Sequence, residues 1–465
     1  ESEKLKDKEL TSQAYYNLGV LYQKTINYPK ALENFTKALT LNPTQEKLVK
    51  ILENTGFVYR ELGKYDSAIY FHKQTLQICE TIGDLKGQAN SLNGIGSVYL
   101  RRGDFESALV SYNKSLSIRK EQKLVDDEAA SYENIGEVYK KMNNYDKALR
   151  YLKLALSIRE ASNDKKKIAY NINSIGNFYL QLKIYDKARE YYSKALSIRE
   201  EIGDKNDIAS TYNNIGTLHR EVGNYEKALE YYQKALDIRK KLSNKENIAV
   251  SLNSIGALYW NKKDYTKAVE FYNLALEIRK EIGEKSQIAA TTKNLGIIYK
   301  DMNSFDKSLS FYQKALDIYM EIGDLSGIAS VQNLKGNLFK KGNNLSRAVE
   351  HYRNAYEIYK ENKMRKELSA VANNLGEALM NTQQYAKSAT ILNEALTVSF
   401  EVKDKESAKT SASLLSELYQ RMGDFRKSLG FMKQYSSLKD SIQIDMNKKR
   451  IAEIEFETAI KVKDK

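Results

Sequence analysis

The sequence predicts an all-α solenoid of about eleven helix-turn-helix units, followed by a C-terminal helix. Three observations predict it: a glycine that returns at a fixed step, small residues that recur with it, and a near absence of proline. Stacked units bury their apolar surface against neighbours instead of around one central core. With two prolines and no linker composition, the 465 residues form one array and not several globular domains.

A glycine column marks the repeat. Gly56 and Gly96 are 40 residues apart, and this step of 40 continues to residue 416, where serine replaces glycine. One earlier copy, Gly19, precedes Gly56 by 37 residues. The eleven positions are Gly19, Gly56, Gly96, Gly136, Gly176, Gly216, Gly256, Gly296, Gly336, Gly376 and Ser416. Self-similarity at a fixed period of this length is the signature of stacked repeats.

Two helices are expected in each repeat. An aromatic residue follows the column glycine by three positions, with His219 and Leu379 as exceptions. Alanine or serine follows the glycine by twelve positions, and alanine often by nineteen, as at Ala268 and Ala275. Apolar residues recur at three- and four-residue spacing in both halves, which is the helical period. Small residues at these positions let two helices approach to about 8–10 Å.

Turn-forming residues separate the two predicted helices. Glycine or asparagine follows most column glycines by seven positions, as at Gly223 and Asn303. An N-cap residue comes next, as at Asn224 and Asp264. A looser turn, such as residues 202–205, is expected to lead from one repeat to the next.

The last segment of the chain departs from the repeat. Residues 1–435 are assigned to the solenoid and residues 436–465 to a capping or connector helix, within a continuous helix that starts near Gly430. Leu438, Ile442 and Met446 are spaced four apart, which suits a helix that covers the open apolar face of the last repeat.

These columns resemble the tetratricopeptide repeat. The match is best in the first repeat, through Tyr15, Leu18, Gly19, Tyr22, Ala31, Phe35, Ala38 and Pro43. Later repeats lack the closing proline and exceed the usual length of about 34 residues, which is similar to Pins-type scaffolds and kinesin light chains. The resemblance covers residues 10–435. It implies a right-handed superhelix whose first helices line a concave groove, and a binding protein rather than an enzyme.

Two columns are candidate ligand-binding positions in this groove. Three residues before the glycine, asparagine recurs six times, and its amide both donates and accepts hydrogen bonds, as an extended peptide requires. Four residues after the glycine, basic residues and the single tryptophan favour an acidic partner and an aromatic anchor. The candidates are Asn93, Asn173, Asn213, Asn253, Asn333, Asn373, Arg220, Trp260, Lys300 and Lys340. Alternatively, the asparagines solvate the groove or bridge neighbouring helices.

Patterns for catalysis and metal binding are missing from the sequence. It contains no HExxH motif, nucleophile elbow or phosphate loop, and its single cysteine excludes a cysteine cluster. We therefore expect no catalytic residue, no metal and no cofactor. His72 and His219 fall in tyrosine columns and are expected in the core, whereas His351 is expected to stand alone beside an aromatic slot.

A column of arginines runs from Arg119 to Arg279 late in the second helices. We interpret it as structural, with each cation complementing the negative end of the helix dipole. Cys79 takes the same place in an earlier repeat and is interpreted as a substituted surface position.

The net charge of +14 is diluted along the chain, with basic and acidic residues alternating as on solvated helix faces. No specific nucleic-acid partner is expected, because no recognition motif or basic stripe accompanies the charge. No contact with a membrane is expected within this chain, since it has no run of eighteen apolar residues. The expected partner is a protein or an extended peptide, and a homodimer is left open.

Two segments near the end carry a second resemblance. The words LKDSI (438–442) and KKRIAEIEFET (448–458) resemble the connector after tetratricopeptide arrays in bacterial membrane-bound sensors with histidine kinase or helix-turn-helix output domains. This resemblance implies the sensor part of a two-component signalling protein, located outside the cytoplasmic membrane. The chain opens with Glu1, as a processed chain or an excised piece would. The alternative is a free-standing cytoplasmic adaptor that joins partner proteins.

Overall fold

The computed structural model describes the backbone of residues 2–463 and the side chains of residues 7–445. Within this part of the chain, every regular element is an α-helix. The helices are α1 (Ser2–Lys24), α2 (Tyr28–Thr40), α3 (Gln45–Glu61), α4 (Tyr65–Ile82), α5 (Leu85–Arg102), α6 (Phe105–Glu121), α7 (Val125–Lys141), α8 (Tyr145–Ala161), α9 (Lys165–Gln181), α10 (Tyr185–Ile202), α11 (Lys205–Glu221), α12 (Tyr225–Lys241), α13 (Lys245–Asn261), α14 (Tyr265–Ile282), α15 (Lys285–Asp301), α16 (Phe305–Ile322), α17 (Leu325–Lys341), α18 (Leu345–Glu361), α19 (Arg365–Asn381), α20 (Tyr385–Glu401), α21 (Lys405–Arg421) and α22 (Phe425–Lys463).

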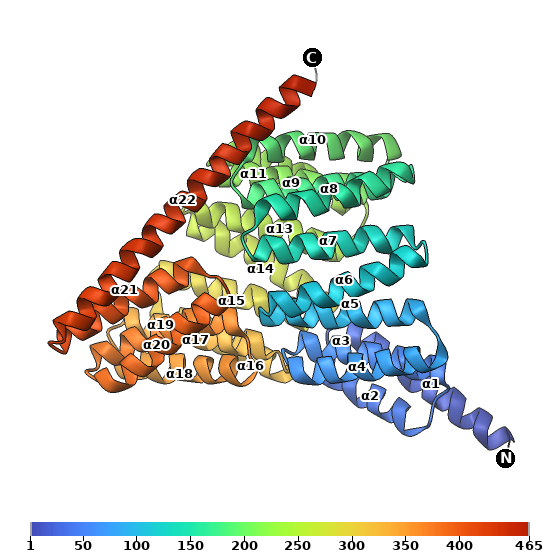
Figure 1. The fold of residues 1–465 in the computed structure, drawn as a ribbon, viewed down its shortest axis with the longest axis horizontal. Coiled ribbons are helices and arrows are strands. Elements are labelled where there is room, and N and C mark those ends of the chain that lie inside the picture. The colour runs from blue at the N-terminus through green and yellow to red at the C-terminus, as the bar shows by residue number, and fades with distance from the viewer. Residues whose placement is uncertain (1, 464–465) are drawn as a thin grey trace. The chain divides into compact units, whose positions relative to one another are not determined.

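Each repeat is a pair of helices joined by a short turn, which confirms the predicted all-helical solenoid (Figure 1). The odd-numbered first helix carries the column glycine, and the second helix carries the small residue twelve positions later. In the repeat formed by α13 and α14, these residues are Gly256 and Ala268. Ala268 is fully buried, as expected for a residue at which two helix backbones approach closely.

The column glycine makes room for an aromatic ring of the second helix. A Cβ atom at Gly216 would lie 2.7 Å from Cδ1 of Tyr232 and 3.2 Å from the backbone oxygen of Ala228. Tyr232 is fully buried, so the ring has no free space into which it can move. Glycine, despite its cost inside a helix, therefore allows the two helices to pack at this distance.

Both kinds of turn are short. Residues 222–224 separate α11 from α12 within a repeat, and residues 203–204 separate α10 from α11 between repeats. Junctions between repeats vary in length, because residues 242–244 separate α12 from α13, so the turn between repeats is not consistently looser than the turn within a repeat. Gly203 has a φ of 79° and Gly223 a φ of 78°, the left-handed conformation that ends a helix without strain in glycine.

N-cap side chains start the helices that follow these turns. The Asn224 side chain accepts a hydrogen bond from the backbone N–H of Lys227 at 3.2 Å. The Asp204 side chain accepts one from the backbone N–H of Asp207, also at 3.2 Å. Each bond satisfies a donor that the first helical turn leaves without an intrahelical partner.

The apolar core runs between successive repeats. In one cluster, Tyr232 and Leu236 of α12 pack with Leu252 and Ile255 of α13 and with Ala275 of α14. Helix α11 also contacts α9 and α13 directly, and these are the first helices of three successive repeats. In this part of the first compact unit, the first helices therefore lie side by side, and they carry Asn173, Asn213 and Asn253.

The chain divides into two compact units. The first comprises Glu1–Val98, Ser107–Lys140 and Asp146–Val331, and the second comprises Tyr99–Glu106, Lys141–Tyr145 and Gln332–Lys465. None of the described helices combines the length and the apolar character that crossing a bilayer requires.

Helix α22 is the last helix of the chain and belongs to the second compact unit. It begins at Phe425 and passes residue 436 without a break. Leu438 is 8% exposed and packs in one cluster with Leu415 and Leu418 of α21. The side chain of Met446 lies outside the described residues, so the capping role assigned to residues 436–465 stays a prediction.

Candidate functional site

Three of the candidate asparagines bond to the next repeat. The side-chain oxygen of Asn93 accepts a hydrogen bond from the Asn134 amide at 2.8 Å. The same bond recurs from Asn214 to Asn173 at 3.1 Å. It recurs again from Asn374 to Asn333 at 3.0 Å. In each case the donor lies 41 residues after the acceptor, so these amides bridge neighbouring first helices.

Asn373 is held in the same way by other groups. It is 4% exposed. Its amide donates to the backbone oxygen of Ser407 at 3.1 Å, and its oxygen accepts from Oγ of Ser411 at 2.7 Å. Both partners belong to α21, the first helix of the following repeat.

Asn213 and Asn253 differ from the other four. Their side-chain oxygens are buried and have no hydrogen-bond partner among the described residues. They occupy the same position in α11 and α13, which contact each other. A buried acceptor without a donor costs about 1–3 kcal/mol, so an N–H group that reached either oxygen would stabilise it.

The basic column is largely ion-paired. Nη2 of Arg220 lies 2.9 Å from Oε1 of Glu221. Nζ of Lys300 lies 3.4 Å from Oδ1 of Asp301, and Nζ of Lys340 lies 2.6 Å from Oε1 of Glu377. Neighbouring carboxylates therefore offset much of the positive charge that the sequence assigns to this column.

Trp260 shares one of these carboxylates. Its indole N–H donates to Oδ2 of Asp301 at 2.9 Å, which brings Trp260 and Lys300 together at one acid. The side chain is 36% exposed, so part of the ring is accessible. Asn253 and Trp260 are seven residues apart in α13, as are Asn213 and Arg220 in α11, and this spacing places each pair on one helix face.

The arginine column is buried and makes specific hydrogen bonds to the next repeat, which agrees with its structural interpretation and adds to the expected contribution from helix dipoles. Arg119, Arg159, Arg199, Arg239 and Arg279 are 3–8% exposed. Nη1 of Arg239 donates to Oγ of Ser251 at 2.7 Å and to the backbone oxygen of Asn247 at 3.3 Å. Burial lowers the pKa of Arg239 from its ordinary value. These arginines link the end of one repeat to the first helix of the next.

Cys79 is fully buried, so its interpretation as a surface position was wrong. It occupies the same inter-repeat slot as the arginines. Burial raises the pKa of the Cys79 thiol to about 11, which keeps the sulfur protonated and unreactive near neutral pH.

The histidines occupy aromatic positions. His72 is 5% exposed and lies against Gly56, which confirms the expected core position. His219 stacks on Tyr231 with ring centroids 5.6 Å apart. His351 was expected to stand alone, but it stacks on Phe339 at 5.1 Å and its Nδ1 lies 2.7 Å from Oε1 of Gln332.

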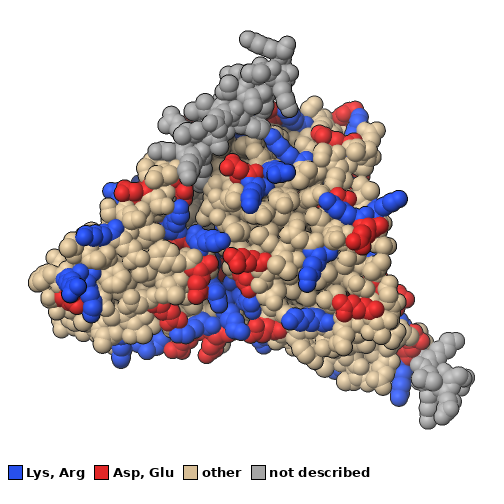
Figure 2. All heavy atoms as spheres, in the orientation of Figure 1, with Lys and Arg blue, Asp and Glu red and all other residues tan. Residues whose placement is uncertain are grey.

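Acidic and basic residues intermix on the surface that Figure 2 shows. Some ion pairs join successive repeats, such as Lys166 with Asp204 at 2.8 Å and Lys245 with Glu281 at 2.9 Å. Among the described residues, no three His, Cys, Asp or Glu side chains gather as metal ligands would.

Comparisons with known proteins concern the repeat. Among curated proteins, the uncharacterized protein ycf37 of Guillardia theta is 32% identical over 76 residues, 16% of this chain and 43% of that protein. The photosystem I assembly protein Ycf3 of Acaryochloris marina is 34% identical over 64 residues, 14% of this chain and 39% of that protein. The chain therefore spans less than half the length of these two relatives.

A solved structure from Pyrococcus horikoshii, a signal transduction ATPase with numerous domains and a tetratricopeptide repeat sensor, shares the fold. The match covers 90% of this chain and 67% of that chain, at 16% identity and a TM-score of 0.50. Tetratricopeptide repeat models match residues 47–121, 167–241, 247–321, 287–361 and 367–441, and two further such models match residues 12–45 and 129–164. Because these matches cover well over half of the sequence, the chain belongs to the tetratricopeptide repeat family, a fold that mediates protein interactions.

Proposed function

We propose that this chain is a non-catalytic protein-binding region that holds an extended peptide along its first helices. The observation that carries the proposal is the pair of unpaired, buried oxygens on Asn213 and Asn253. Backbone N–H groups of an extended peptide are donors of the kind that these oxygens lack. Two such groups in adjacent repeats would fix the direction and the register of the peptide.

The surroundings of this pair favour recognition of the peptide backbone over acidic side chains. Arg220 and Lys300 already face Glu221 and Asp301, so a bound carboxylate would compete with an existing ion pair. The partly exposed Trp260 ring offers an apolar contact on the same face of α13 as Asn253. The basic column of Arg220, Lys300 and Lys340 adds a preference for peptides with acidic side chains, but it is not the main source of binding in this proposal.

A double substitution tests the peptide site. A library of random ten-residue peptides would be selected on the wild-type chain, and the selected peptides titrated against N213A/N253A by fluorescence anisotropy. Loss of two charge-neutral hydrogen bonds should weaken binding by about ten-fold or more.

The matched control is N113A/N273A, which removes two exposed amides on the second helices α6 and α14. It should bind the selected peptides as the wild type does. Equal affinity of all three proteins for every selected peptide would exclude the first-helix site.

We further propose that the chain is the sensor part of a bacterial two-component signalling protein, outside the cytoplasmic membrane. The resemblance of residues 438–442 to a sensor connector supports this role. The continuous helix α22, 39 residues long, supports it as well, since a rigid helix that starts in the last repeat can transmit a change in packing. The alternative role is a cytoplasmic adaptor that bridges soluble partners.

The parent gene distinguishes the two roles. A sensor predicts an upstream export signal and, downstream, a membrane helix with a kinase or DNA-binding domain. An adaptor predicts that neither is encoded. Any affinity for DNA should vanish near physiological salt, because nonspecific phosphate contacts are strongly salt-dependent.

A further inference from the structure

Most repeats contain a stacked pair of rings between their two helices. The aromatic residue three positions after the column glycine stacks on a ring fifteen positions after it. The centroids lie 5.1–5.6 Å apart and the planes within 16° in Tyr59–Phe71, Tyr139–Tyr151, His219–Tyr231, Tyr259–Phe271, Tyr299–Phe311, Phe339–His351 and Tyr419–Phe431. The fold therefore has a recurrent slot that is shaped for aromatic rings.

A cation of the second helix covers this slot. Nζ of Lys307 lies 5.4 Å from the ring centre of Tyr299, and Nζ of Lys427 lies 5.0 Å from that of Tyr419. Lys147, Lys267 and Arg347 cover the corresponding rings in their repeats. A cation over a ring face is worth about 0.5–1 kcal/mol at exposed sites, so in five of the seven slots a ring and a cation are held together.

The Gly376 repeat lacks both rings but keeps the cation. Leu379 and Ile391 take the two aromatic positions, and Lys387 takes the position of the covering lysine. Nζ of Lys387 reaches Oε1 of Gln384 at 3.3 Å instead of a ring. Leu379 and Ile391 line a cavity of about 200 Å³, together with Leu375 and with residues of α18 from the preceding repeat.

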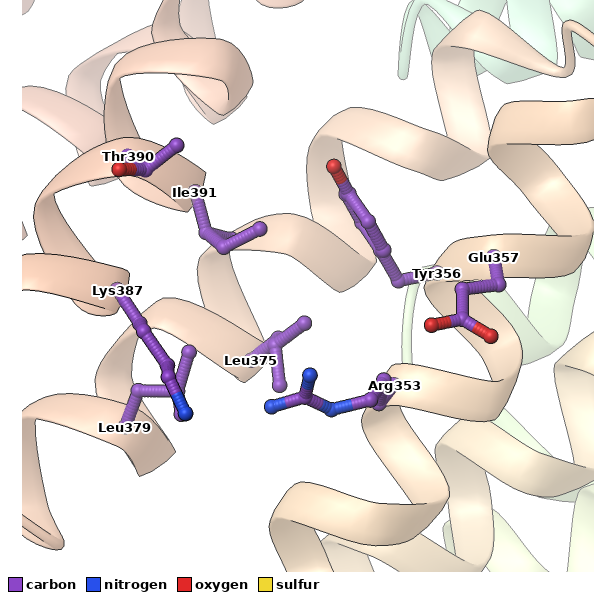
Figure 3. Close-up of a pocket in the computed structure, with 8 residues that line it drawn as sticks. All are labelled: Arg353, Tyr356, Glu357, Leu375, Leu379, Lys387, Thr390 and Ile391. Carbon is purple, nitrogen blue, oxygen red and sulfur yellow. The ribbon is translucent and has the colours of Figure 1, made fainter. Parts of the chain in front are cut away.

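Two cations converge on this cavity. Figure 3 shows Arg353 of α18 and Lys387 of α20 reaching toward each other from opposite sides of it. No described residue forms an ion pair or a hydrogen bond with Arg353. Glu357 is the one carboxylate in the lining, so the cavity carries a net positive charge. The Tyr356 hydroxyl donates a hydrogen bond to Oε2 of Glu394 at 2.5 Å. Its ring therefore contributes an apolar surface to the cavity lining.

We propose that this cavity binds one aromatic side chain of an acidic peptide. An apolar cavity of about 150 Å³ is large enough to hold benzene, so one ring fits into the available volume. The ring would pack against Leu379 and Ile391 in the cavity, and a carboxylate beside it in the peptide would pair with Arg353 and Lys387. None of the cavity residues belongs to the two first-helix columns, so this site is separate from the proposed peptide groove.

The test uses three blocked peptides: Ac-Gly-Glu-Phe-Glu-Gly-NH2, a version with alanine for phenylalanine, and a version with glutamine for both glutamates. Titrations are followed by NMR of labelled isoleucine and leucine methyl groups in the full chain. The phenylalanine peptide should shift the Ile391 and Leu379 methyl signals through its ring current. Each altered peptide should bind at least about five-fold more weakly.

The variant L379Y/I391F introduces the ring pair that the other repeats have. It should weaken binding of the phenylalanine peptide by at least about ten-fold while the fold is retained. R353Q and K387Q change exposed or half-buried side chains and should weaken binding several-fold. K427Q is the matched control, because its slot is filled by Tyr419, and it should bind as the wild type does.

The proposal is overturned if the phenylalanine and alanine peptides bind equally, or if none binds at millimolar concentration. It is also overturned if L379Y/I391F, R353Q and K387Q all bind as the wild type does. The variant N213A/N253A should retain full binding of the phenylalanine peptide, which separates failure of this site from failure of the first-helix groove.

Discussion

Sixteen positions after the column glycine, tyrosine and histidine occupy the same buried slot with different consequences. The Tyr192 hydroxyl donates to Oδ1 of Asn177 at 2.7 Å, so its polar end is paired. Neither ring nitrogen of His72 has a hydrogen-bond partner among the described residues. Burial, with a smaller contribution from Arg60, lowers the pKa of His72 to about 4, so the ring is neutral in the folded chain.

This difference predicts a pH-dependent stability that H72Y removes. Unfolded histidine titrates near pH 6.5 and the folded one near pH 4, so the unfolded state binds more protons in between. Stability that is present above pH 6.5 should be lost as the pH falls toward 4. The wild type should lose up to about 1.4 kcal/mol per pH unit relative to H72Y, measured by urea denaturation at several pH values.

The comparison with H72Y also cancels the contribution of Glu53, which titrates in both proteins. Burial, and then the charge of Asp84, raises the pKa of Glu53 to about 7. That shift has the opposite sign, because the folded state takes up a proton first as the pH falls. A stability difference between wild type and H72Y that stayed constant from pH 7 to pH 4.5 would contradict the assignment.

At the scale of the helices, the junction between repeats depends on one slot at the end of each second helix. Arginine fills it in five successive repeats, Tyr319 and Tyr359 fill it in the next two, and Cys79 fills it earlier. All of these side chains are buried. In repeat proteins, stability depends on such contacts between nearest neighbours, so the slot is a place where coupling between repeats is set.

Arg239 offers the clearest test of this coupling. R239A leaves the Ser251 hydroxyl and the Asn247 carbonyl without their partner and opens a cavity, so it should destabilise the chain by about 2–4 kcal/mol. S251A removes one of these bonds and should cost about 1 kcal/mol. Chemical denaturation followed by circular dichroism measures both.

The neighbouring exposed residue supplies the control for that experiment. K240A should change stability by less than about 0.5 kcal/mol, as surface substitutions usually do. If R239A were as mild as K240A, the arginine column would have no role in joining repeats.

At the scale of the whole molecule, an array of repeats needs its last apolar face covered. Leu438 of α22 packs on Leu415 and Leu418, and Nζ of Lys405 donates to Oγ of Ser441 at 2.8 Å. These contacts favour a capping role for the segment after residue 435. Because repeats contact mainly their neighbours, loss of this cover should act locally.

L438D should therefore loosen the end of the array selectively. Placing a charge in the cluster of Leu415 and Leu418 should increase amide hydrogen exchange in α20 and α21 by about ten-fold or more. Exchange in α11 to α13 should stay unchanged. S437D, one residue earlier at an exposed position, is the control and should exchange as the wild type does throughout.

The sequence by itself determined the repeat and its helices, because these depend on local patterns. The helical spacing of apolar residues and the glycine at the helix crossing are features of a single repeat, and the 40-residue step shows that the same repeat recurs. The turns were less predictable. Lys183 and Lys263 adopt a φ of 62° and 61°, a conformation that favours glycine or asparagine, so the turn forms in these repeats without its usual residue.

Only the tertiary structure decided which polar side chains form hydrogen bonds between repeats and which have a group without a partner. The sequence placed the arginines at helix ends but did not reveal their burial, because charge is rarely buried without partners. A hydroxyl twelve residues later, as in Arg239 and Ser251, was the missed sequence signal. Likewise, six equivalent asparagines divide into four that bridge repeats and two, Asn213 and Asn253, with unpaired oxygens. Such differences arise from contacts about 40 residues apart, which a local pattern does not encode.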